Sequence, residues 1–471
     1  MFKKEMSRRR MLKLTALGTA VTTLAACSPK VVEKVVPEEV EKEAPPVAEK
    51  EVDPAPKEPI TLTLHMRAGG DVSEAPIYVE RPAVFMEEHP DINIELSPIP
   101  AGEYWAKITT MAAAGTIGDC TWGRATFGDM ERHYRTGIIS HLDDYMDAEG
   151  VSPDEYLDGA RELVTVEGRF CAIPKNVNAH AEVYINEEMA AEKGYEFDDI
   201  YSLTADDLAQ MAVDMSEGPE DDREVFGFFP QINGILYIAK FNRMFGSWEM
   251  NDEETESLLD NEEWYRAVEY VQRFFKQRTA LRAEALPTGG AEALFAARRL
   301  GMIFSGRWRW KGIDNHVKEA DEPFAWRAYL IPRATGPNPH PDDALPYTSS
   351  SDTHEMCTQT EHPVETFKFL YALGDQKFTE LVAKGIGYLT ARVDDIETIE
   401  PFATDWLRTQ YAAQQLTGRL MYGANLRGEE VQAALVNGLD PIWELSQELT
   451  REFMDRLKAD VDSVLALPTP V

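Results

Sequence analysis

The segment Ile60-Thr61-Leu62-Thr63-Leu64 begins a stretch of sequence in which strand and helix patterns alternate. Its apolar residues fall on every second position, which is typical of a half-buried strand. More segments follow as helix, strand, helix, strand and helix, at 78–89, 91–96, 104–114, 119–122 and 128–135. Such alternation predicts the α/β fold class, with a mostly parallel sheet that helices cover on both faces.

The rest of the chain has longer helical patterns and two further strands. Helices are predicted at 204–215, 262–276, 363–373 and 441–457, and strands at 300–304 and 328–332. No internal repeat is evident, and no second apolar span follows the N-terminal one. A chain of 471 residues is long enough for two or three domains, each with a core of its own.

The charge of the chain is unevenly distributed. The sequence has 47 basic and 82 acidic side chains, and its formal charge is -35. Residues 1–27 carry +5, residues 28–59 carry -4 and residues 60–471 carry -36. A field of this sign repels phosphate backbones, so we expect no nucleic-acid partner.

The N-terminus has the pattern of an export signal, which we assign to residues 1–27. Basic residues precede an apolar stretch at 14–26 that is too short to span a bilayer but suits a signal peptide. Ser7-Arg8-Arg9-Arg10 resembles a twin-arginine signal, which implies export after folding. Leu24-Ala25-Ala26-Cys27 resembles a bacterial lipobox, so Cys27 is expected to carry a lipid that anchors the protein to the membrane. A chance cysteine is the alternative.

Residues 28–59 are expected to form a disordered tether. They consist mainly of Val, Glu, Lys, Pro and Ala, without an aromatic residue or a glycine. Such a segment cannot bury enough apolar surface to fold, and its prolines keep it extended. As a flexible coil it would reach on the order of 30 Å.

Motifs for catalysis and cofactor binding are scarce. The sequence has no GxSxG elbow, HExxH pair, Walker A loop or EF-hand loop, so we expect neither an enzyme nor a bound cofactor or metal. Beyond Cys27 three cysteines remain, without CxxC spacing: Cys120, Cys171 and Cys357. At most one disulfide can form among them, and their apolar surroundings predict buried thiols.

A series of short motifs, taken in order, resembles one known family. It includes Tyr104-Trp105-Ala106-Lys107, Gly118-Asp119-Cys120-Thr121-Trp122, Gly168-Arg169-Phe170-Cys171-Ala172-Ile173-Pro174, Val183-Tyr184-Ile185-Asn186 and Gly306-Arg307-Trp308-Arg309-Trp310. The order and spacing resemble the extracellular solute-binding proteins of ABC importers, the large family 1 that includes maltose- and glycerol-phosphate-binding proteins. The resemblance covers residues 60–471. It departs at Glu187, where the family has lysine.

The resemblance implies a type II periplasmic-binding-protein fold, in which two α/β lobes joined by crossing hinge strands close on a ligand. Lobe one would comprise 60–178 plus 327–388, and lobe two 179–326 plus 389–471. The hinge strands would lie near 176–183 and 324–331. The resemblance also implies an ABC permease as partner, which reads lobe closure, and the head is expected to be a monomer.

The resemblance also suggests which residues hold the ligand. A sugar presents hydroxyl edges and apolar C–H faces, so its site needs aromatic platforms and planar or charged hydrogen-bonding groups. The candidates are Trp308, Trp310, Trp122, Trp248, Tyr104, Asn178, Gln231, Asn233, Arg307, Asp352 and Asn425. Core packing is the alternative for each tryptophan, and helix capping is the alternative for Asn233.

Three functions follow from these features. The first is a membrane-tethered receptor that binds a mono- or oligosaccharide for an ABC importer. The second is a receptor for a phosphorylated polyol or another polar solute, although the acidic head disfavours a highly anionic ligand unless a local arginine such as Arg307 overrules its field. The third is a secreted glycoside-acting enzyme with two catalytic carboxylates.

Overall fold

The structure, a computed structural model, describes the chain in ranges separated by gaps. The described residues are 59–68, 75–125, 128–179, 182–197, 203–232, 235–251, 253, 255–332, 334, 349–395 and 427–468. The expected signal peptide and residues 28–58 of the expected tether lie outside these ranges, and so do Cys27, Asn233 and Asn425. Lys57–Val471 form one compact unit.

The first sheet of this unit has five strands in the order β2-β1-β3-β13-β6. They are β1 (Ile60–Ala68), β2 (Ile92–Pro100), β3 (Cys120–Arg124), β6 (Ile173–Pro174) and β13 (Asp352–Met356). β1 is parallel to β2 and β3, whereas β13 is antiparallel to β3 and β6. Leu62, Leu64 and Met66 of β1 are buried, which confirms the period-two pattern.

The second sheet has four strands in the order β11-β8-β10-β9. They are β8 (Glu182–Asn186), β9 (Phe226–Phe229), β10 (Leu300–Ser305) and β11 (Trp326–Leu330). β9 and β10 are parallel, but β8 is antiparallel to both β10 and β11. The prediction of a mostly parallel sheet is therefore wrong, because both sheets are mixed.

The mixed pairing has a cause in the connections. β7 (Asn178–Ala179) leads almost directly into β8, and β12 (Ser349–Ser350) leads directly into β13. A strand that enters a sheet in this way needs no helical crossover, so it is free to run antiparallel to its neighbours. β7 and β12 also pair antiparallel with each other, as a separate two-stranded ladder.

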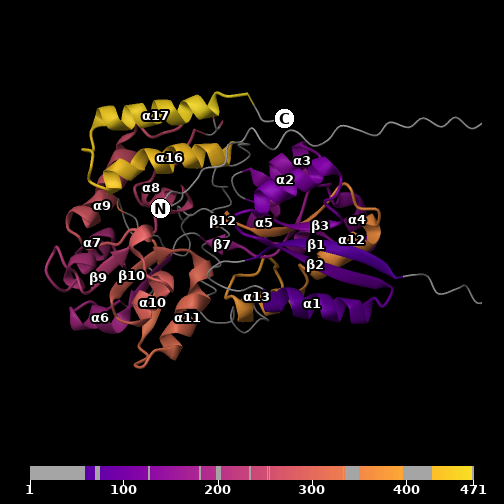
Figure 1. Cartoon of the computed structure of the whole chain (residues 1–471), viewed down its shortest axis with the longest axis horizontal. Coiled ribbons are helices and arrows are strands. Elements are labelled where there is room, and N and C mark those ends of the chain that lie inside the picture. The colour runs from indigo at the N-terminus through magenta and orange to yellow at the C-terminus, as the bar shows by residue number, and fades with distance from the viewer. Residues whose placement is uncertain are drawn as a thin grey trace, which may run out of the picture. The chain divides into compact units, whose positions relative to one another are not determined.

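Helices cover both faces of the five-stranded sheet, as predicted. α1 and α13 lie on one face, and α2 and α3 lie on the other (Figure 1). The helices of this part are α1 (Ala75–Glu88), α2 (Tyr104–Ala114), α3 (Asp129–Arg135), α4 (Asp143–Glu149), α5 (Asp158–Leu163), α12 (Pro363–Ala372) and α13 (Gln376–Gly385). A short 3-10 turn, η2 (Pro153–Glu155), and the hairpin of β4 (Thr165–Val166) with β5 (Arg169–Phe170) complete it.

The second sheet has its own set of helices. They are α6 (Glu187–Glu192), α7 (Ala205–Asp214), α8 (Ile235–Met244), α9 (Glu262–Lys276), α10 (Gly290–Ala296), α11 (Trp310–Glu319), α16 (Gly428–Trp443) and α17 (Arg451–Leu465), with the 3-10 turns η3 (Ala283–Ala285) and η4 (Arg307–Arg309). Several begin at a capping side chain. Asn261 accepts a hydrogen bond from the backbone N–H of Trp264 at the start of α9, and Thr204 forms a capping box with Asp207 at the start of α7.

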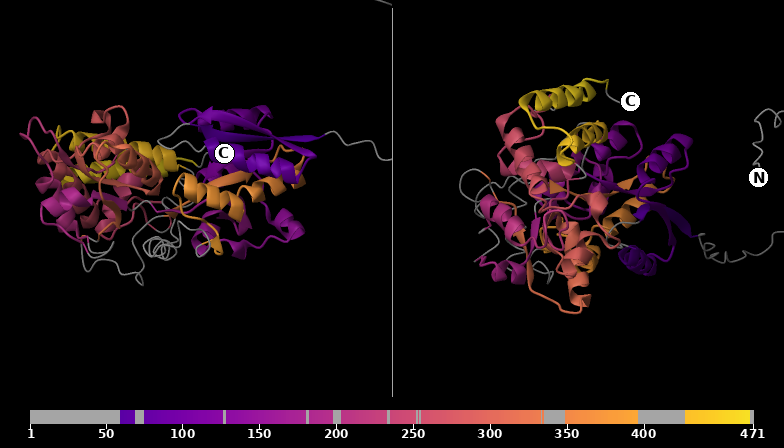
Figure 2. Two further views of the ribbon diagram at one scale, coloured as in Figure 1. Left: turned by 90° about the horizontal axis from the view of Figure 1, so that it is seen from below. Right: turned by 60° about the vertical axis from the view of Figure 1, so that its left-hand side comes forward.

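The single helix predicted at 441–457 is wrong. α16 ends at Trp443, and α17 begins at Arg451 after Thr450 has accepted a hydrogen bond from the N–H of Phe453. Between them Leu445 has a positive φ of 57°. This backbone conformation lies outside the right-handed helical region, so the helix ends there. The two helices lie side by side in every view (yellow, Figures 1 and 2).

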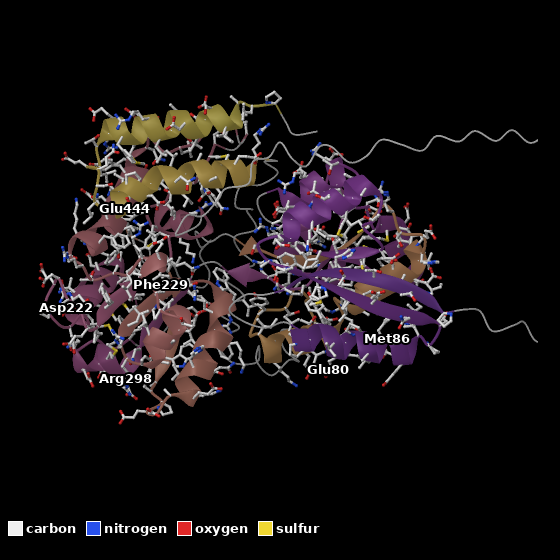
Figure 3. All side chains as sticks on the ribbon, in the orientation of Figure 1. Glu80, Met86, Asp222, Phe229, Arg298 and Glu444 are labelled. Carbon is white, nitrogen blue, oxygen red and sulfur yellow. The ribbon has the colours of Figure 1, made fainter. Side chains whose placement is uncertain are left out.

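The buried side chains form separate cores around the two sheets. One core draws on residues between 62 and 177 and between 356 and 391. Two others draw on residues between 183 and 331 and between 431 and 461. In Figure 3, Phe229 of β9 lies inside the second part, whereas Asp222 and Glu444 lie at its surface.

The observed pairing bears on the lobe boundaries expected from the sequence. The boundary at 327 falls inside β11, which pairs with β8 along its whole length in the four-stranded sheet. The boundary at 388 falls before Leu389 and Ala391, which are buried in the core of the five-stranded sheet. Leu389 and Ala391 accept hydrogen bonds from the backbone of Val177 and Leu157, and these bonds hold the segment there.

Candidate functional site

The two sheets bring strand ends to the crossing strands β7 and β12. Asp352, which follows β12, lies opposite Arg124, the last residue of β3. Glu182, which follows β7 closely, lies opposite Ser305, the last residue of β10. The carboxyl ends of β3 and β10 therefore both lie next to the two-stranded ladder of β7 and β12, which we call the crossing ladder. In open α/β sheets, ligands bind outside the carboxyl ends of strands.

An aromatic group lies at the carboxyl end of β3. The indole of Trp122 makes an edge contact with the ring of Tyr104, at 5.5 Å between centroids, and lies 5.7 Å from the indole of Trp105. Tyr104 is fully buried, and its hydroxyl donates to the carbonyl oxygens of Trp122 (2.6 Å) and His65 (3.1 Å). The phenol thus fixes the start of α2 to β1 and β3. Trp122 is buried in the core of the five-stranded sheet, and Trp105 is the partly exposed indole of the group.

Guanidinium groups accompany the two indoles. The Cζ of Arg67 lies 5.5 Å from the ring centre of Trp122, and the Cζ of Arg124 lies 4.8 Å from that of Trp105. Both arginines come from strand ends, since Arg67 is next to last in β1 and Arg124 is last in β3. Arginine over an indole face is a favourable cation–π arrangement.

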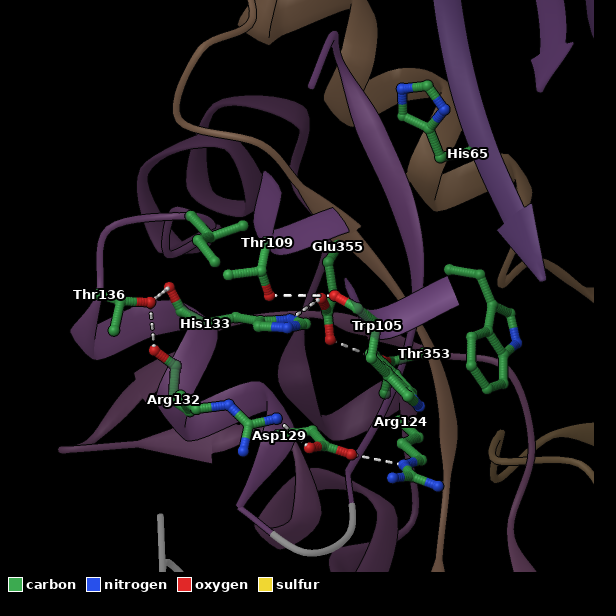
Figure 4. A network of polar contacts seen from close by, with 12 residues as sticks. His65, Trp105, Thr109, Arg124, Asp129, Arg132, His133, Thr136, Thr353 and Glu355 are labelled. Atoms are coloured by element: carbon green, nitrogen blue, oxygen red, sulfur yellow. Dashed lines mark hydrogen bonds and ion pairs between the residues drawn. The ribbon is translucent and has the colours of Figure 1, made fainter. Parts of the chain in front are cut away.

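A polar network supports this group from below (Figure 4). Asp129, which is buried, accepts hydrogen bonds from Arg124 Nε and from Arg132, each at 2.5 Å. Behind Trp105, the Nδ1 of His133 lies 3.1 Å from a carboxylate oxygen of Glu355. Gly123 leaves room for that carboxylate, because a Cβ on Gly123 would lie 1.9 Å from Glu355 Oε1.

Trp308 lies at the carboxyl end of β10, in η4. It is half-buried and packs against the core of the five-stranded sheet, although it follows a strand of the other sheet. η4 also contacts β7. The Nζ of Lys240, on α8, lies 5.5 Å from the centre of the Trp308 ring. Trp308 is therefore a side chain from one sheet that reaches the region around the other.

Arg307 and Trp310 also join the two parts. Arg307 is buried, and its Nε donates to the carbonyl oxygen of Gly387 at 2.7 Å. Its guanidinium lies 4.9 Å from the ring centre of Trp310. Gly387 has a positive φ of 83°, and a Cβ there would lie 2.5 Å from the Trp310 ring. A glycine is thus required for this close approach.

Gln231 belongs to a buried hydrogen-bond network at the ends of β9 and β10. Its Oε1 accepts from Ser305 Oγ and from Arg309 Nε (3.1 Å). Arg309 also pairs with Glu292 of α10. Burial, followed by the nearby charge of Arg309, lowers the pKa of Lys240 well below its usual value. The ends of β9 and β10 therefore carry several buried side chains that can form hydrogen bonds.

Asp352 holds the crossing segment to the sheet. Its carboxylate accepts from Asn176 Nδ2 (3.1 Å) and lies 3.2 Å from the buried Nζ of Lys175. Lys175 in turn lies 5.8 Å and 5.4 Å from the ring centres of Tyr78 and Tyr388. Asn178 is in β7, where it pairs with Ser350 of β12. The crossing ladder is therefore built on charged and aromatic side chains.

Trp248 lies in a different group of contacts, around α8 and α9. The Cζ of Arg243 lies 3.1 Å from the centre of its ring, and the carbonyl of Trp248 accepts from Trp264 Nε1 at 3.0 Å. Arg243 also pairs with the buried Glu249. The packing of Trp248 on α8 matches the alternative considered for it from the sequence.

The structure adds Trp105, Arg67 and Arg124 to the residues singled out from the sequence. Trp105 is adjacent to Tyr104 in a quoted motif, yet helical spacing alone does not show that its ring turns toward β3. Arg67 precedes the Gly69-Gly70 loop, so its place just before a strand-to-loop transition was a usable signal. Arg124 follows Trp122 by two residues in the same strand.

The cysteine prediction is confirmed as far as burial is concerned. Cys120, Cys171 and Cys357 are buried and present as free thiols. Burial raises the pKa of the Cys171 thiol to about 12, so it is not activated as a nucleophile. Among the described residues no group of three or more His, Cys, Asp or Glu side chains is placed to hold a metal ion. In the same residues no helix is long and apolar enough to cross a bilayer.

Comparison with known proteins gives one family and a set of similar folds. The family model described as bacterial extracellular solute-binding protein matches residues 82–409. No curated protein sequence matches the chain.

Three solved structures illustrate the similarity of fold. An ABC substrate-binding protein of Listeria monocytogenes in complex with cycloalternan has a TM-score of 0.71 at 14% identity, over 87% of this chain and 100% of its own. A solute-binding protein of Thermotoga lettingae bound with α-D-tagatose has a TM-score of 0.72 at 13% identity, over 86% and 100%. A maltose/maltodextrin-binding domain of Bdellovibrio bacteriovorus bound to maltotriose has a TM-score of 0.68 at 13% identity, over 86% and 99%. The α/β fold of type II periplasmic binding proteins is thereby confirmed.

Proposed function

Because this chain belongs to the bacterial extracellular solute-binding proteins, we propose that it is the substrate-binding component of an ABC importer and that its solute is a carbohydrate. The observation that carries this proposal is the group at the crossing ladder. Indoles from β3 and α2, and Trp308 from the end of β10, adjoin buried networks of arginine, glutamine and carboxylate groups. Such a mixture matches the apolar faces and hydroxyl edges of sugar rings.

The solute would bind between two lobes and hold them closed. We assign lobe one to the five-stranded sheet and lobe two to the four-stranded sheet, joined at β7 and β12. A ligand that contacts Trp122 on one side and Trp308 on the other binds the closed arrangement better than an open one, so it shifts the equilibrium toward closure. The permease would then recognise the closed conformation. Binding of this kind needs no covalent step.

The anchoring of the protein is part of the proposal. A lipid on Cys27 would hold the head at the membrane through the tether of residues 28–59, on the outer face where a solute-binding protein meets its solute. Export after folding, as Ser7-Arg8-Arg9-Arg10 suggests, is supported by the three buried free thiols. Thiols that are packed inside a core before export are shielded from oxidation in an oxidising compartment.

A thermal-shift screen of the purified head with mono- and oligosaccharides tests the carbohydrate proposal. A sugar that binds the folded protein should increase its free energy of unfolding by about 2.7 kcal/mol at a hundredfold excess over Kd, and this increase raises the melting temperature. Isothermal titration calorimetry then gives Kd. If no sugar has an effect while amino acids or peptides do, the carbohydrate assignment is wrong. Chromatography of the same mixtures detects cleaved sugars, whose formation would favour the glycoside-acting enzyme.

A further inference from the structure

The turn η4 is fixed to the four-stranded sheet by the buried side chain of Arg309. Its Nε donates to Gln231 Oε1 (3.1 Å) and to Ser305 Oγ (2.9 Å). Its guanidinium also pairs with Glu292 of α10. These partners lie in α10 and at the ends of β9 and β10, so η4 moves together with the four-stranded sheet.

Arg307, two residues earlier in the same turn, reaches the other sheet. Its Nε donates to the carbonyl oxygen of Gly387 at 2.7 Å. Gly387 follows α13 and precedes Leu389, which is buried in the core of the five-stranded sheet. On its own side, Arg307 Nη1 lies 3.7 Å from Glu182 Oε1, and both side chains are buried. A guanidinium held on one sheet thus bonds a backbone carbonyl of the other.

The indole of Trp310 makes a second contact at the same place. Trp310 begins α11, and its ring lies 6.2 Å from the ring of Trp326 in β11. Gly387 lies directly against this indole, since a Cβ on Gly387 would come within 2.5 Å of it. The backbone at the end of α13 therefore fits against the start of α11 only without a side chain.

Both contacts depend on the relative position of the two sheets. A hydrogen bond is lost once its heavy atoms separate beyond about 3.5 Å, and packing on a ring weakens when a gap of about 1 Å opens. A rotation about the crossing ladder that moves η4 by about 1 Å away from α13 is therefore enough to break them. Arg307 also precedes Trp308, the proposed platform for the solute, so closure and binding involve the same turn.

We propose that Arg307, Trp310 and Gly387 form an interlobe latch that stabilises the closed arrangement whether or not a solute is bound. The inference rests on the proposed two-lobe function. Arg307 is then a positioning residue for closure and not a solute contact, since Gly387 and Glu182 engage its buried guanidinium. The latch raises the affinity for every solute by the same factor, because it acts on the population of the closed state.

Pulsed electron paramagnetic resonance between two spin labels measures closure without any solute. The labels are attached to Glu80→Cys and Asp222→Cys, at exposed positions on the two parts (Figure 3). Cys27→Ser removes the thiol of the expected anchor, and the three buried thiols are shielded from the label. The separation of residues 80 and 222 in this structure identifies the latched arrangement.

Arg307→Gln and Gly387→Ala are the test variants. The first removes the donor, and the second places a methyl group against the Trp310 ring. Each should lower the ratio of latched to open molecules by about tenfold or more, as expected for the loss of a hydrogen bond from a charged group or of a close packing contact. Should one of them fail to fold, the other decides.

Two matched controls change similar features within a single lobe. Arg243→Gln removes a buried guanidinium that pairs with Glu249 and lies against the Trp248 ring. Gly150→Ala adds a Cβ at the end of α4, where φ is also positive, at 70°, but where a Cβ meets nothing within 4 Å. Both should lower the stability of the fold and keep the distance distribution of the parent protein.

Calorimetry with the sugars that bind in the thermal-shift screen separates a latch from a solute contact. Arg307→Gln should weaken the binding of every such sugar by the same factor, about tenfold. A factor that differs from sugar to sugar would place Arg307 in the solute site and overturn the latch.

The outcomes separate the latch from the proposed function. If the test variants keep the distance distribution of the parent, or if the controls shift it as much, the latch is wrong and the carbohydrate function stands. If no sugar binds, the carbohydrate function is wrong, and the distance measurement still decides the latch.

Discussion

At the scale of single residues, Trp308 is the side chain whose replacement best distinguishes a ligand platform from core packing. It is half-buried at the end of β10. Trp308→Ala should weaken sugar binding by about 1–3 kcal/mol, which calorimetry measures, because one stacking surface is lost. Trp264→Ala is the control, since Trp264 is fully buried in α9 and its loss should cost about 3–5 kcal/mol of folding free energy. A Trp308→Ala variant that is as unstable as Trp264→Ala would assign Trp308 to the core.

The buried His354 leads to a second prediction for a single residue, about how the stability of the protein depends on pH. Burial, followed by the charge of Lys175, lowers the pKa of His354 well below its usual value. The unfolded chain therefore binds a proton near pH 6.5 that the folded protein does not bind until lower pH, so stability is present above about pH 6.5 and is lost as the pH falls below it. The free energy of unfolding should fall by up to about 1.4 kcal/mol per pH unit from this group.

Denaturant unfolding at several pH values measures this slope. His354→Gln should have a shallower slope below pH 6.5 than the parent, whatever its baseline stability; His65, whose pKa burial also lowers, keeps part of the slope. Tyr78→Phe removes the hydroxyl that lies 2.9 Å from His354 Nε2 but keeps the imidazole, so its slope should match the parent. An unchanged slope in His354→Gln would show that another group governs the acid side.

At the scale of secondary-structure elements, the packing of α7 on β9 depends on one glycine. A Cβ on Gly227 would lie 2.0 Å from the carbonyl oxygen of Ala212, a backbone atom that cannot turn aside. Gly227→Ala should therefore lower the free energy of unfolding by about 1–3 kcal/mol or more. Gly102→Ala, where a Cβ has open space, should change it by no more than about 0.5 kcal/mol. Equal stability of the two variants would contradict this close approach.

At the scale of the whole molecule, the anchor is the feature to test. Cys27→Ser removes the sulfur that a lipidating enzyme would modify, so the expressed protein should move from the membrane fraction to the soluble extracytoplasmic fraction. Fractionation and immunoblotting of cells expressing the full chain measure the distribution. Ser28→Ala, a neighbouring change that leaves the thiol, should remain with the membrane. Membrane association of Cys27→Ser would show that the lipobox assignment is wrong.

Much of the fold could be predicted because it depends on local periodicity. The boundaries of α2 and α9 agree with the predicted segments, since apolar spacing and capping residues act within a few positions. The break between α16 and α17 was missed, because the apolar pattern continues while Leu445 and Thr450 interrupt the backbone. The directions of β8 and β13 were missed because strand direction depends on distant partners.

The sequence by itself determined that this is an α/β protein of a solute-binding family, with an export signal pattern and an acidic head, because composition, periodicity and motif order are properties of the chain alone. Only the tertiary structure decided which side chains meet. Arg67 and Trp122 are far apart in the chain, yet β1 and β3 place them 5.5 Å apart, and Arg307 reaches Gly387 across 80 residues. Such contacts depend on strand register and side-chain direction, which no local pattern contains.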